Sequence, residues 1–250
     1  MRRPWIGWAA FAAFLLVWEG IARANIVSPI ILVGPSAIVA AFRESGHEFL
    51  LAFGVTLFEI ATAIAFAWTF GIVVGLIAGF WPRVGLAAGP ILAALFAIPL
   101  ITWYPLLMDW FGIGSLSKIV FGALAGFFPI ALNTMSGVRV QDRRYVVFGH
   151  SVGATRMQIA LLLLLPLALP AVISGLRIGT ALTVIGVIVS EMLASVAGLG
   201  FWISYNRTLF ATGQVYLGIS LALLCVVAVN GGLTALENRV GGWQAVEETG

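Results

Sequence analysis

Most of the charge in the middle of this chain is gathered in one short stretch. Only 9% of the 250 residues are charged, yet five charged side chains lie close together and are followed at once by an apolar run. A polar segment beside a strongly apolar one is typical of a surface where a membrane protein meets water, lipid headgroups or a partner. The five residues are Arg139, Asp142, Arg143, Arg144 and Arg156.

The spacing within this stretch predicts a helix over residues 142–160. Asp142 can cap its first turn, because a carboxylate accepts backbone N–H groups and suits the positive end of a helix. Gly149 and Gly153, four residues apart, would leave a notch free of side chains on the helix surface. Thr155 and Gln158 would face water or a partner, and Pro166 would end the helix.

Two interpretations of this helix stay open from the residues alone. The helix either binds another protein in its notch or lies along the membrane surface with its arginines among lipid headgroups. The residues that would make the contact are Arg143, Arg144, Gly149, His150, Ser151, Gly153, Ala154, Thr155, Arg156 and Pro166.

The sequence offers little that could act in catalysis. Its two histidines, His47 and His150, fall in the connections between predicted spans, and neither a His-Glu-x-x-His nor a Gly-x-Ser-x-Gly motif occurs. The one cysteine, Cys225, lies inside an apolar run, which excludes a disulfide framework. We therefore predict no catalytic residues, no metal site, no cofactor of the chain's own and no nucleic-acid partner.

The elements that must position the charged stretch are membrane helices. Hydrophobic residues make up 61% of the chain, against about 45–50% in soluble domains, and its mean hydropathy is +1.08. Six apolar stretches are near or above the ~20 residues that a helix needs to cross a bilayer. The sequence thus predicts an all-α integral membrane protein with about six transmembrane helices, at residues 5–22, 52–80, 85–109, 116–138, 167–190 and 215–236.

The N-terminal region contains two further features. Ala22-Arg23-Ala24 resembles a signal-peptidase site, but more spans follow, so we favour an uncleaved first span over removal of residues 1–24. In the connector that follows, Ser36 is a suitable N-cap for a short helix to about Arg43, which would lie along the membrane surface.

Charge placement predicts the orientation of the spans. With the N-terminus inside, eight Lys or Arg residues lie on the cytoplasmic side and four outside, which is the bias that the positive-inside rule expects. The inner set is Arg2, Arg3, Arg83, Arg139, Arg143, Arg144, Arg156 and Arg239, and the outer set is Arg23, Arg43, Lys118 and Arg207. Both termini and the charged stretch are therefore expected in the cytoplasm, and residues 23–48 and 195–213 outside.

The spans also contain candidates for packing and for a pathway. Gly71, Gly75 and Gly79 lie on one face of the second span, where another helix can approach closely. Prolines interrupt the third span, so the backbone there either forms a simple kink or lines a water-filled pathway. The candidate pathway residues are Thr102, Trp103, Tyr104, Asn133 and Glu191.

The main alternative from the residues is an ion-coupled secondary transporter or channel. Such proteins carry ionisable side chains at the membrane midplane. Glu59 lies within the second predicted span. Burying its charge in the membrane costs free energy unless it is paired or faces a cavity. If that helix begins late, Glu59 lies in water instead. The residues alone leave both positions of Glu59 open.

The charged stretch resembles the cytoplasmic loop motif of permease subunits in binding-protein-dependent ABC importers. That motif reads Glu-Ala-Ala, three residues, Gly, nine residues, Ile, one residue, Leu-Pro. Gly153 takes the glycine position, Leu163 the isoleucine position, and Leu165-Pro166 the ending, whereas Val147-Phe148-Gly149 replaces Glu-Ala-Ala.

Further fragments resemble the nitrate/sulfonate/taurine type of permease in the same order along nearly the whole chain. They are "VWEGIAR" with "GPSAIVAAFRE", "TLFEIATAIAFAWTFGIVVGLIAG", "IPLITWYPLLMDWFGIGSLSKI", "LPLALPAVISGLRIG", "SEMLASVAGLGFWI" and "LENRVGGWQ".

The resemblance implies a type I ABC importer permease with a coupling helix between the fourth and fifth spans. It further implies a second permease copy, two cytoplasmic ATPases that bind ATP and Mg, an extracytoplasmic binding protein, and a bacterial-type cytoplasmic (inner) membrane. Small organic or inorganic anions are the substrates of the closest subgroup, which also includes transporters of heterocycles. This chain has no Gly-x-x-x-x-Gly-Lys-Ser/Thr loop, so it is not the ATPase.

Overall fold

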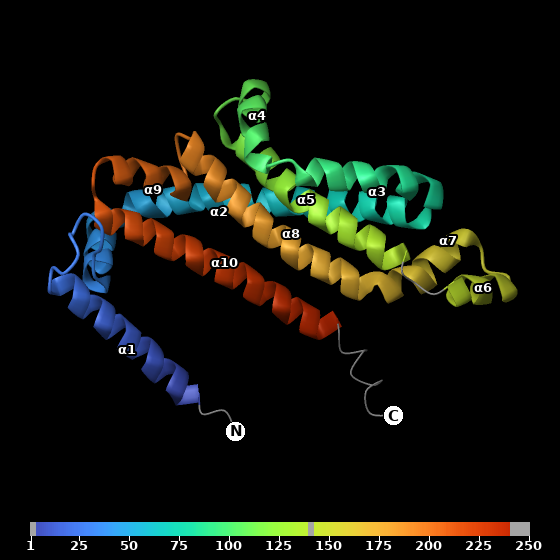
Figure 1. Cartoon of the computed structure of the whole chain (residues 1–250), viewed down its shortest axis with the longest axis horizontal. Helices are drawn as coiled ribbons and strands as arrows, with labels where there is room; N and C mark the ends of the chain where they lie inside the picture. Colours follow the sequence, from blue (N-terminus) through green and yellow to red (C-terminus); the bar gives the residue numbers. More distant parts are fainter. Residues whose placement is uncertain (1–3, 140–142, 241–250) are drawn as a thin grey trace. The chain divides into compact units, whose positions relative to one another are not determined.

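A computed structural model of the chain describes residues 4–139 and 143–240, and these are almost entirely helical (Figure 1). The helices are α1 (Pro4–Arg23), α2 (Pro35–Phe80), α3 (Pro82–Ala97), the 3₁₀ helix η1 (Leu100–Trp103), α4 (Tyr104–Phe111), α5 (Ser115–Arg139), α6 (Arg143–Ser151), α7 (Arg156–Gln158), the π-helix η2 (Ile159–Leu164), α8 (Leu165–Leu193), α9 (Leu199–Thr208) and α10 (Thr212–Val240).

The chain folds as two compact units. Of the described residues, unit 1 comprises 4–57 and 191–225, and unit 2 comprises 58–139, 143–190 and 226–240. The long helices α2, α8 and α10 each contribute one part to either unit.

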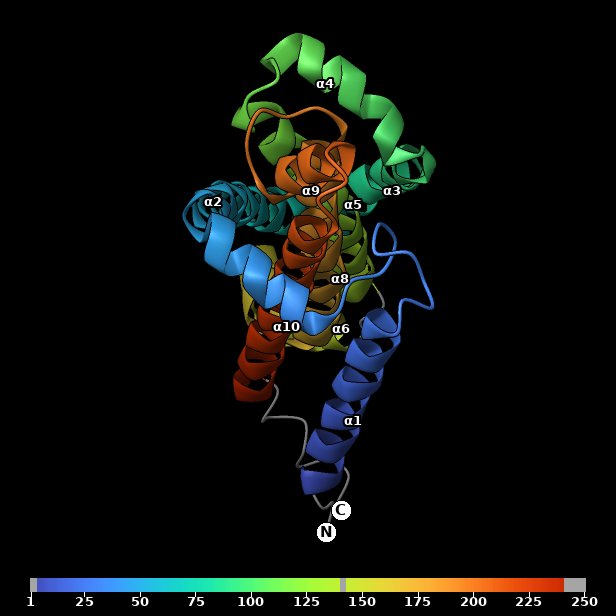
Figure 2. The same ribbon diagram turned by 90° about the vertical axis from the view of Figure 1, so that its left-hand side faces the viewer.

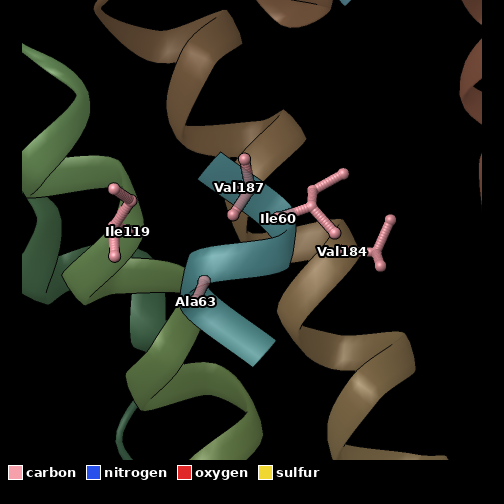
Figure 3. Close-up of a cluster of buried hydrophobic side chains, with 5 residues drawn as sticks. All are labelled: Ile60, Ala63, Ile119, Val184 and Val187. Carbon is pink, nitrogen blue, oxygen red and sulfur yellow. The ribbon is translucent and has the colours of Figure 1, made fainter. Parts of the chain in front are cut away.

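Unit 2 is built around α5, whose side chains are the most thoroughly buried of any long helix. Ile119 of α5 joins Ile60 and Ala63 of α2 and Val184 and Val187 of α8 in one buried apolar cluster (Figure 3). Removal of such side chains from water is the main force that holds helices together in an aqueous protein. In a membrane, close van der Waals packing between helices takes over that role.

Glycines bring α2 and α5 into close contact in unit 2. A Cβ built on Gly71 would lie 2.7 Å from Ile130 Cγ2, and one on Gly79 would lie 2.7 Å from Val138 Cβ. Between them, a Cβ on Gly75 would lie 2.6 Å from Thr134 Cβ. The glycine face predicted from the sequence is therefore a packing surface.

Unit 1 has a smaller apolar core. Phe49 of α2 packs edge-on against Trp202 of α9, with ring centroids 5.7 Å apart, and Leu199 and Leu217 complete the buried cluster with Ala41. Figure 2 shows α1 and the first part of α2, both in unit 1, joined by the loop of residues 24–34. In that loop region, Ser36 donates to the carboxylate of Glu19 through its backbone N–H (3.0 Å) and its hydroxyl (2.6 Å).

The start of α2 agrees in part with the sequence prediction. A short helix from Ser36 to about Arg43 is predicted, and the first part of α2 runs from Pro35 to a break at Ser45, where φ is −121° and ψ is 18°. The predicted connector before a span from residue 52 is wrong, because the second helix resumes directly after Ser45 and continues to Phe80. Residues 44–51 contain no proline and include the buried Phe49. Packing of Phe49 in unit 1 keeps this stretch helical. In the first turn of α2, the carboxylate of Glu19 accepts the hydrogen bond from the backbone N–H of Ser36. The sequence predicted that the Ser36 side chain would be the capping acceptor.

The third predicted span, residues 85–109, is broken. Helix α3 ends at Ala97, and after Pro99 the chain continues as η1 and α4, bent by 88° from α3. Proline lacks the N–H that would continue the hydrogen-bond ladder. Among the described residues, four helices are long and apolar enough to cross a membrane, and the bent pair makes a fifth if it counts as one span. Helix α1 covers the predicted first span at residues 5–22 but is not among these helices, so the structure supports four or five of the six predicted spans.

Candidate functional site

The loop between α5 and α8 in unit 2 contains two helical pieces, where the sequence predicted one helix over residues 142–160. Helix α6 ends at Ser151 and α7 begins at Arg156. Gly153 has φ +77°, and its N–H donates to His150 O (3.1 Å), while the N–H of Ala154 donates to Gly149 O (2.9 Å). This is a Schellman ending, in which a left-handed glycine closes the helix. The predicted cap Asp142 lies outside the described residues.

Thr155 and Gln158 close the start of α7. The backbone N–H of Thr155 donates to Gln158 Oε1 (2.8 Å), and the N–H of Gln158 donates to Thr155 Oγ1 (3.3 Å). This reciprocal pair is a capping box. Both residues are exposed, as predicted. The prediction of one continuous helix is wrong, and the Thr-x-x-Gln spacing contained the signal for a new helix start.

The π-helix η2 connects the loop to α8. The N–H of Leu165 donates to Ala160 O, five residues back, which shifts the bonding partners by one position just before Pro166, a residue without an N–H. The sequence predicted that Pro166 ends the loop helix. Instead α8 begins at Leu165 and continues through Pro170.

Gly149 and Gly153 do not form an open notch. Gly149 is buried, and a Cβ built on it would lie 2.6 Å from Ile159 Cγ1. Its absent side chain thus lets α6 pack on η2. Gly153 lies beyond the end of α6, where it supplies the turn. The notch prediction is wrong because it assumed one continuous helix.

The exposed surface of the loop contains both large apolar side chains and polar ones. Tyr145, Val147, Phe148 and Val152 are between 42% and 65% exposed. Arg144, His150 and Ser151 are exposed among them, and Thr155 and Pro166 are exposed farther along, whereas Ala154 is half-buried. For Arg143 and Arg156 the structure gives the backbone position only. Helix α6 lies in unit 2 and comes after α5 and before α8 along the chain (Figure 1).

Four of the five predicted pathway residues belong to unit 2. Thr102 is exposed and donates to Pro99 O (2.7 Å), and Asn133 is half-buried and donates to Pro129 O (2.8 Å). Tyr104 is 1% exposed and packs edge-on against Phe121, with ring centroids 5.2 Å apart. Trp103 is half-buried, and its Nε1 is a buried atom without a hydrogen-bond partner. Tyr104 therefore packs within the unit, while Thr102 faces outward.

Glu191, the fifth, belongs to unit 1 and is 1% exposed. Its Oε1 accepts a hydrogen bond from Thr56 Oγ1 (2.6 Å), and its Oε2 accepts one from the backbone N–H of Gly200 (2.7 Å). Its carboxylate thus binds the first turn of α9. Sequence reasoning missed this contact because Thr56 is far away along the chain.

Two further charged residues are buried in unit 2. The sequence left open whether Glu59 is buried or solvated. In the structure it is buried, with 1% of its surface exposed. Lys118, which we had counted among the outer loop cations, is also 1% exposed. Its ammonium donates to Ile113 O (2.6 Å) and Gly114 O (2.9 Å). Among the described residues, His, Cys, Asp and Glu form no group of three that could hold a metal ion.

Comparisons with known proteins agree with this architecture. The family model for the binding-protein-dependent transport system inner membrane component matches residues 71–242. The taurine transport system permease protein TauC of Escherichia coli is 31% identical over 97% of this chain and 90% of its own length. The formylaminopyrimidine transport permease protein ThiX of Halalkalibacterium halodurans is 32% identical over 94% of each chain.

Among solved structures, an inward-facing form of the MetNI methionine ABC transporter matches with a TM-score of 0.68 at 19% identity, over 79% of this chain and 98% of that chain. At 19% identity the match supports the fold alone, which is that of a type I ABC permease. The apolar helices, the broken third span and the family match over more than half of the chain lead to one conclusion. This protein belongs to the inner membrane components of binding-protein-dependent transport systems, the multi-pass permeases of ABC importers.

Proposed function

We propose that two copies of this chain form the pathway of an ABC importer and that the loop of residues 143–158 binds a cytoplasmic ATPase on each copy. ATP and Mg are bound and ATP is hydrolysed on those partner subunits, and an extracytoplasmic binding protein delivers the substrate. An ion-coupled mechanism is not favoured, because relatives over nearly the whole chain are named as permeases of transport systems.

The observation that carries the loop assignment is the exposure of large apolar side chains on α6 and in the turn that follows it. Phe148 is 59% exposed and Val152 is 65% exposed, in a segment that also carries arginines. Apolar patches rimmed by polar residues are typical of protein–protein contact sites. The Gly149 contact with Ile159 supports the same role, because it joins α6 to η2 and so gives a bound partner a firm connection toward α8.

The orientation follows from the charge distribution of the sequence. We place both termini and α6 in the cytoplasm, and α9 on the outer side, on the basis of the eight-to-four division of Lys and Arg, which becomes eight to three without the buried Lys118. This orientation puts the exposed apolar side chains of α6 on the side where ATP is available.

For the substrate we propose a small organic or inorganic anion of the sulfonate and nitrate class. The support is the similarity to the taurine permease over 97% of this chain. The similarity to a formylaminopyrimidine permease favours a neutral heterocycle as the second candidate. In either case the binding protein selects the substrate, and the pathway accepts what is delivered.

The test of the loop assignment is a charge introduced at Phe148. A tagged chain is purified from its native membrane, and the co-purifying ATPase is identified by mass spectrometry and quantified. Phe148→Asp should reduce the recovered ATPase about tenfold or more, because truncation of an interface anchor costs ~2 kcal/mol or more. The matched control is Phe210→Asp, since Phe210 is 73% exposed on the opposite predicted side. Equal ATPase recovery with both variants would show that α6 lies on the membrane surface and binds no partner.

A further inference from the structure

The buried carboxylate of Glu191 joins three segments of unit 1. Glu191 lies near the end of α8, Thr56 lies on α2, and Gly200 lies in the first turn of α9. Thr56 Oγ1 donates to Glu191 Oε1 (2.6 Å) and itself accepts from the backbone N–H of Leu199 (2.7 Å). The N–H of Gly200 donates to Glu191 Oε2 (2.7 Å). Two N–H groups at the start of α9, which have no partner within the helix, are satisfied in this way.

Gly198 makes this approach possible. Its φ is +101° and its ψ is 169°, a region of backbone conformation that is essentially restricted to glycine. A Cβ built on it would overlap the carboxylate of Glu191. The turn before α9 therefore has the conformation and the free space that the carboxylate needs.

Helix α9 depends on such contacts for its position. It has ten residues, and isolated helices of that length are marginal in water, so tertiary contacts must hold it. Ile203 packs on Gly218 of α10, where an added Cβ would lie 2.5 Å from Ile203 Cγ1. A negative charge at the helix N-terminus adds favourable electrostatics to this packing.

We infer that Glu191 and Thr56 are positioning residues that fix α9. Glu191 therefore binds this helix and does not line the pathway. The inference deepens the proposed function, because α9 lies in the segment predicted to face the side from which the binding protein delivers substrate. A loosened α9 should raise the KM for the loaded binding protein in stimulated ATP hydrolysis more than it lowers kcat.

The experiment reads the position of α9 directly, in the full-length chain with Cys225→Ser as background. Ile203→Cys serves as the reporter, because Ile203 is 5% exposed, and Tyr205→Cys serves as the exposed reference, at 53%. A membrane-impermeant maleimide should label position 203 slowly in the parent. Thr56→Val should raise that rate about tenfold, since it leaves the Leu199 N–H and the carboxylate with one partner fewer in a buried site.

Conservative variants separate the hydroxyl from general packing. Thr56→Ser keeps the hydroxyl and should label at the parental rate, while Glu191→Gln should match Thr56→Val, and the two changes together should do little more than either alone. Thr69→Val is the control, because Thr69 lies on the same helix, is exposed and bonds only Ala65 O of its own helix (2.8 Å). Should Thr56→Val fail to accumulate, Glu191→Gln carries the comparison.

Three results would overturn the inference: parental labelling in Thr56→Val or, where that variant does not accumulate, in Glu191→Gln; fast labelling in Thr56→Ser; or equally fast labelling in Thr69→Val. The labelling rates are independent of transport. A chain that holds α9 as described but shows no ATPase-dependent transport would therefore count against the proposed function alone. A change of KM with Glu191→Gln but not with Thr56→Val would instead assign Glu191 to the pathway.

Discussion

A methyl group added at Gly75 should push α2 and α5 apart. The new Cβ would lie 2.6 Å from Thr134 Cβ and 2.7 Å from Ala131 O, whereas ordinary van der Waals contact begins at 3.4 Å. The two helices must therefore separate locally by about 0.8 Å, the difference between 3.4 and 2.6 Å. A main-chain oxygen cannot turn away as a flexible side chain does, so the backbone of α5 has to move.

The magnitude follows from the cost of overpacking, about 1–3 kcal/mol for an extra methyl group in a tight core. Alanine is favoured over glycine in a helix by about 1 kcal/mol, which partly offsets this cost. Gly54→Ala is the matched control, because Gly54 is also on α2 and a Cβ there meets nothing within 4 Å. The difference between the two variants isolates the packing cost.

The assay compares apparent Tm values of the two purified variants in the same detergent and at the same heating rate, because unfolding of such proteins is commonly irreversible. At about 2–4 °C per kcal/mol for a chain of this size, Gly75→Ala should melt roughly 2–12 °C below Gly54→Ala. Equal Tm values for the two variants would refute the close packing of α2 on α5.

Three further changes test the loop and the start of α2. Gly153→Asn should keep the φ of +77° at little cost, whereas Gly153→Leu should cost about 1–2 kcal/mol and reduce ATPase recovery; equal recovery would contradict the left-handed turn. Gly149→Val should lift α6 from Ile159 and speed proteolysis between α6 and α7 compared with Val152→Ala, and an unchanged cleavage rate would contradict the buried contact. Ser36→Ala removes the hydroxyl that donates to Glu19 (2.6 Å) and should lower the free energy of unfolding by about 1 kcal/mol, the net worth of one hydrogen bond; a Tm equal to that of the parent would show that the contact adds no stability.

Local patterns predicted the parts of the fold that depend on sequence neighbours. The spacing of Gly71, Gly75 and Gly79 correctly predicted a close helix contact, because residues four apart share a helix face. The prolines of the third span correctly predicted an irregularity, which the structure has as a break at Pro99.

Features that depend on distant residues were beyond local reasoning. Phe49 keeps the polar start of α2 helical through its contact with Trp202, and Glu191 meets Thr56 across the fold. Lys118 looked like an outer loop cation, but carbonyls at the end of the preceding turn hold its ammonium in the interior.

The sequence correctly predicted helical structure between α5 and α8, but not its division into two helices. The Gly149/Gly153 notch presumed helical geometry through Gly153, and the Schellman ending at that residue removes it. The helix start at Thr155 and Gln158 was present in the sequence as a capping pattern that the prediction of one helix did not use. Phe148 and Val152 are exposed whereas Ile159 is buried, so these three apolar residues do not share one face.

The central claim is that this permease moves substrate only when a partner ATPase hydrolyses ATP. The most direct measurement is uptake of labelled taurine, as a representative sulfonate, and of labelled nitrate into proteoliposomes that hold the chain with its co-purified ATPase and enclose ATP and Mg. The loaded binding protein is supplied outside. We predict uptake only with ATP and the binding protein both present, and none with an ATPase variant that binds but does not hydrolyse ATP. Uptake driven by a proton or sodium gradient through the chain alone would contradict the account.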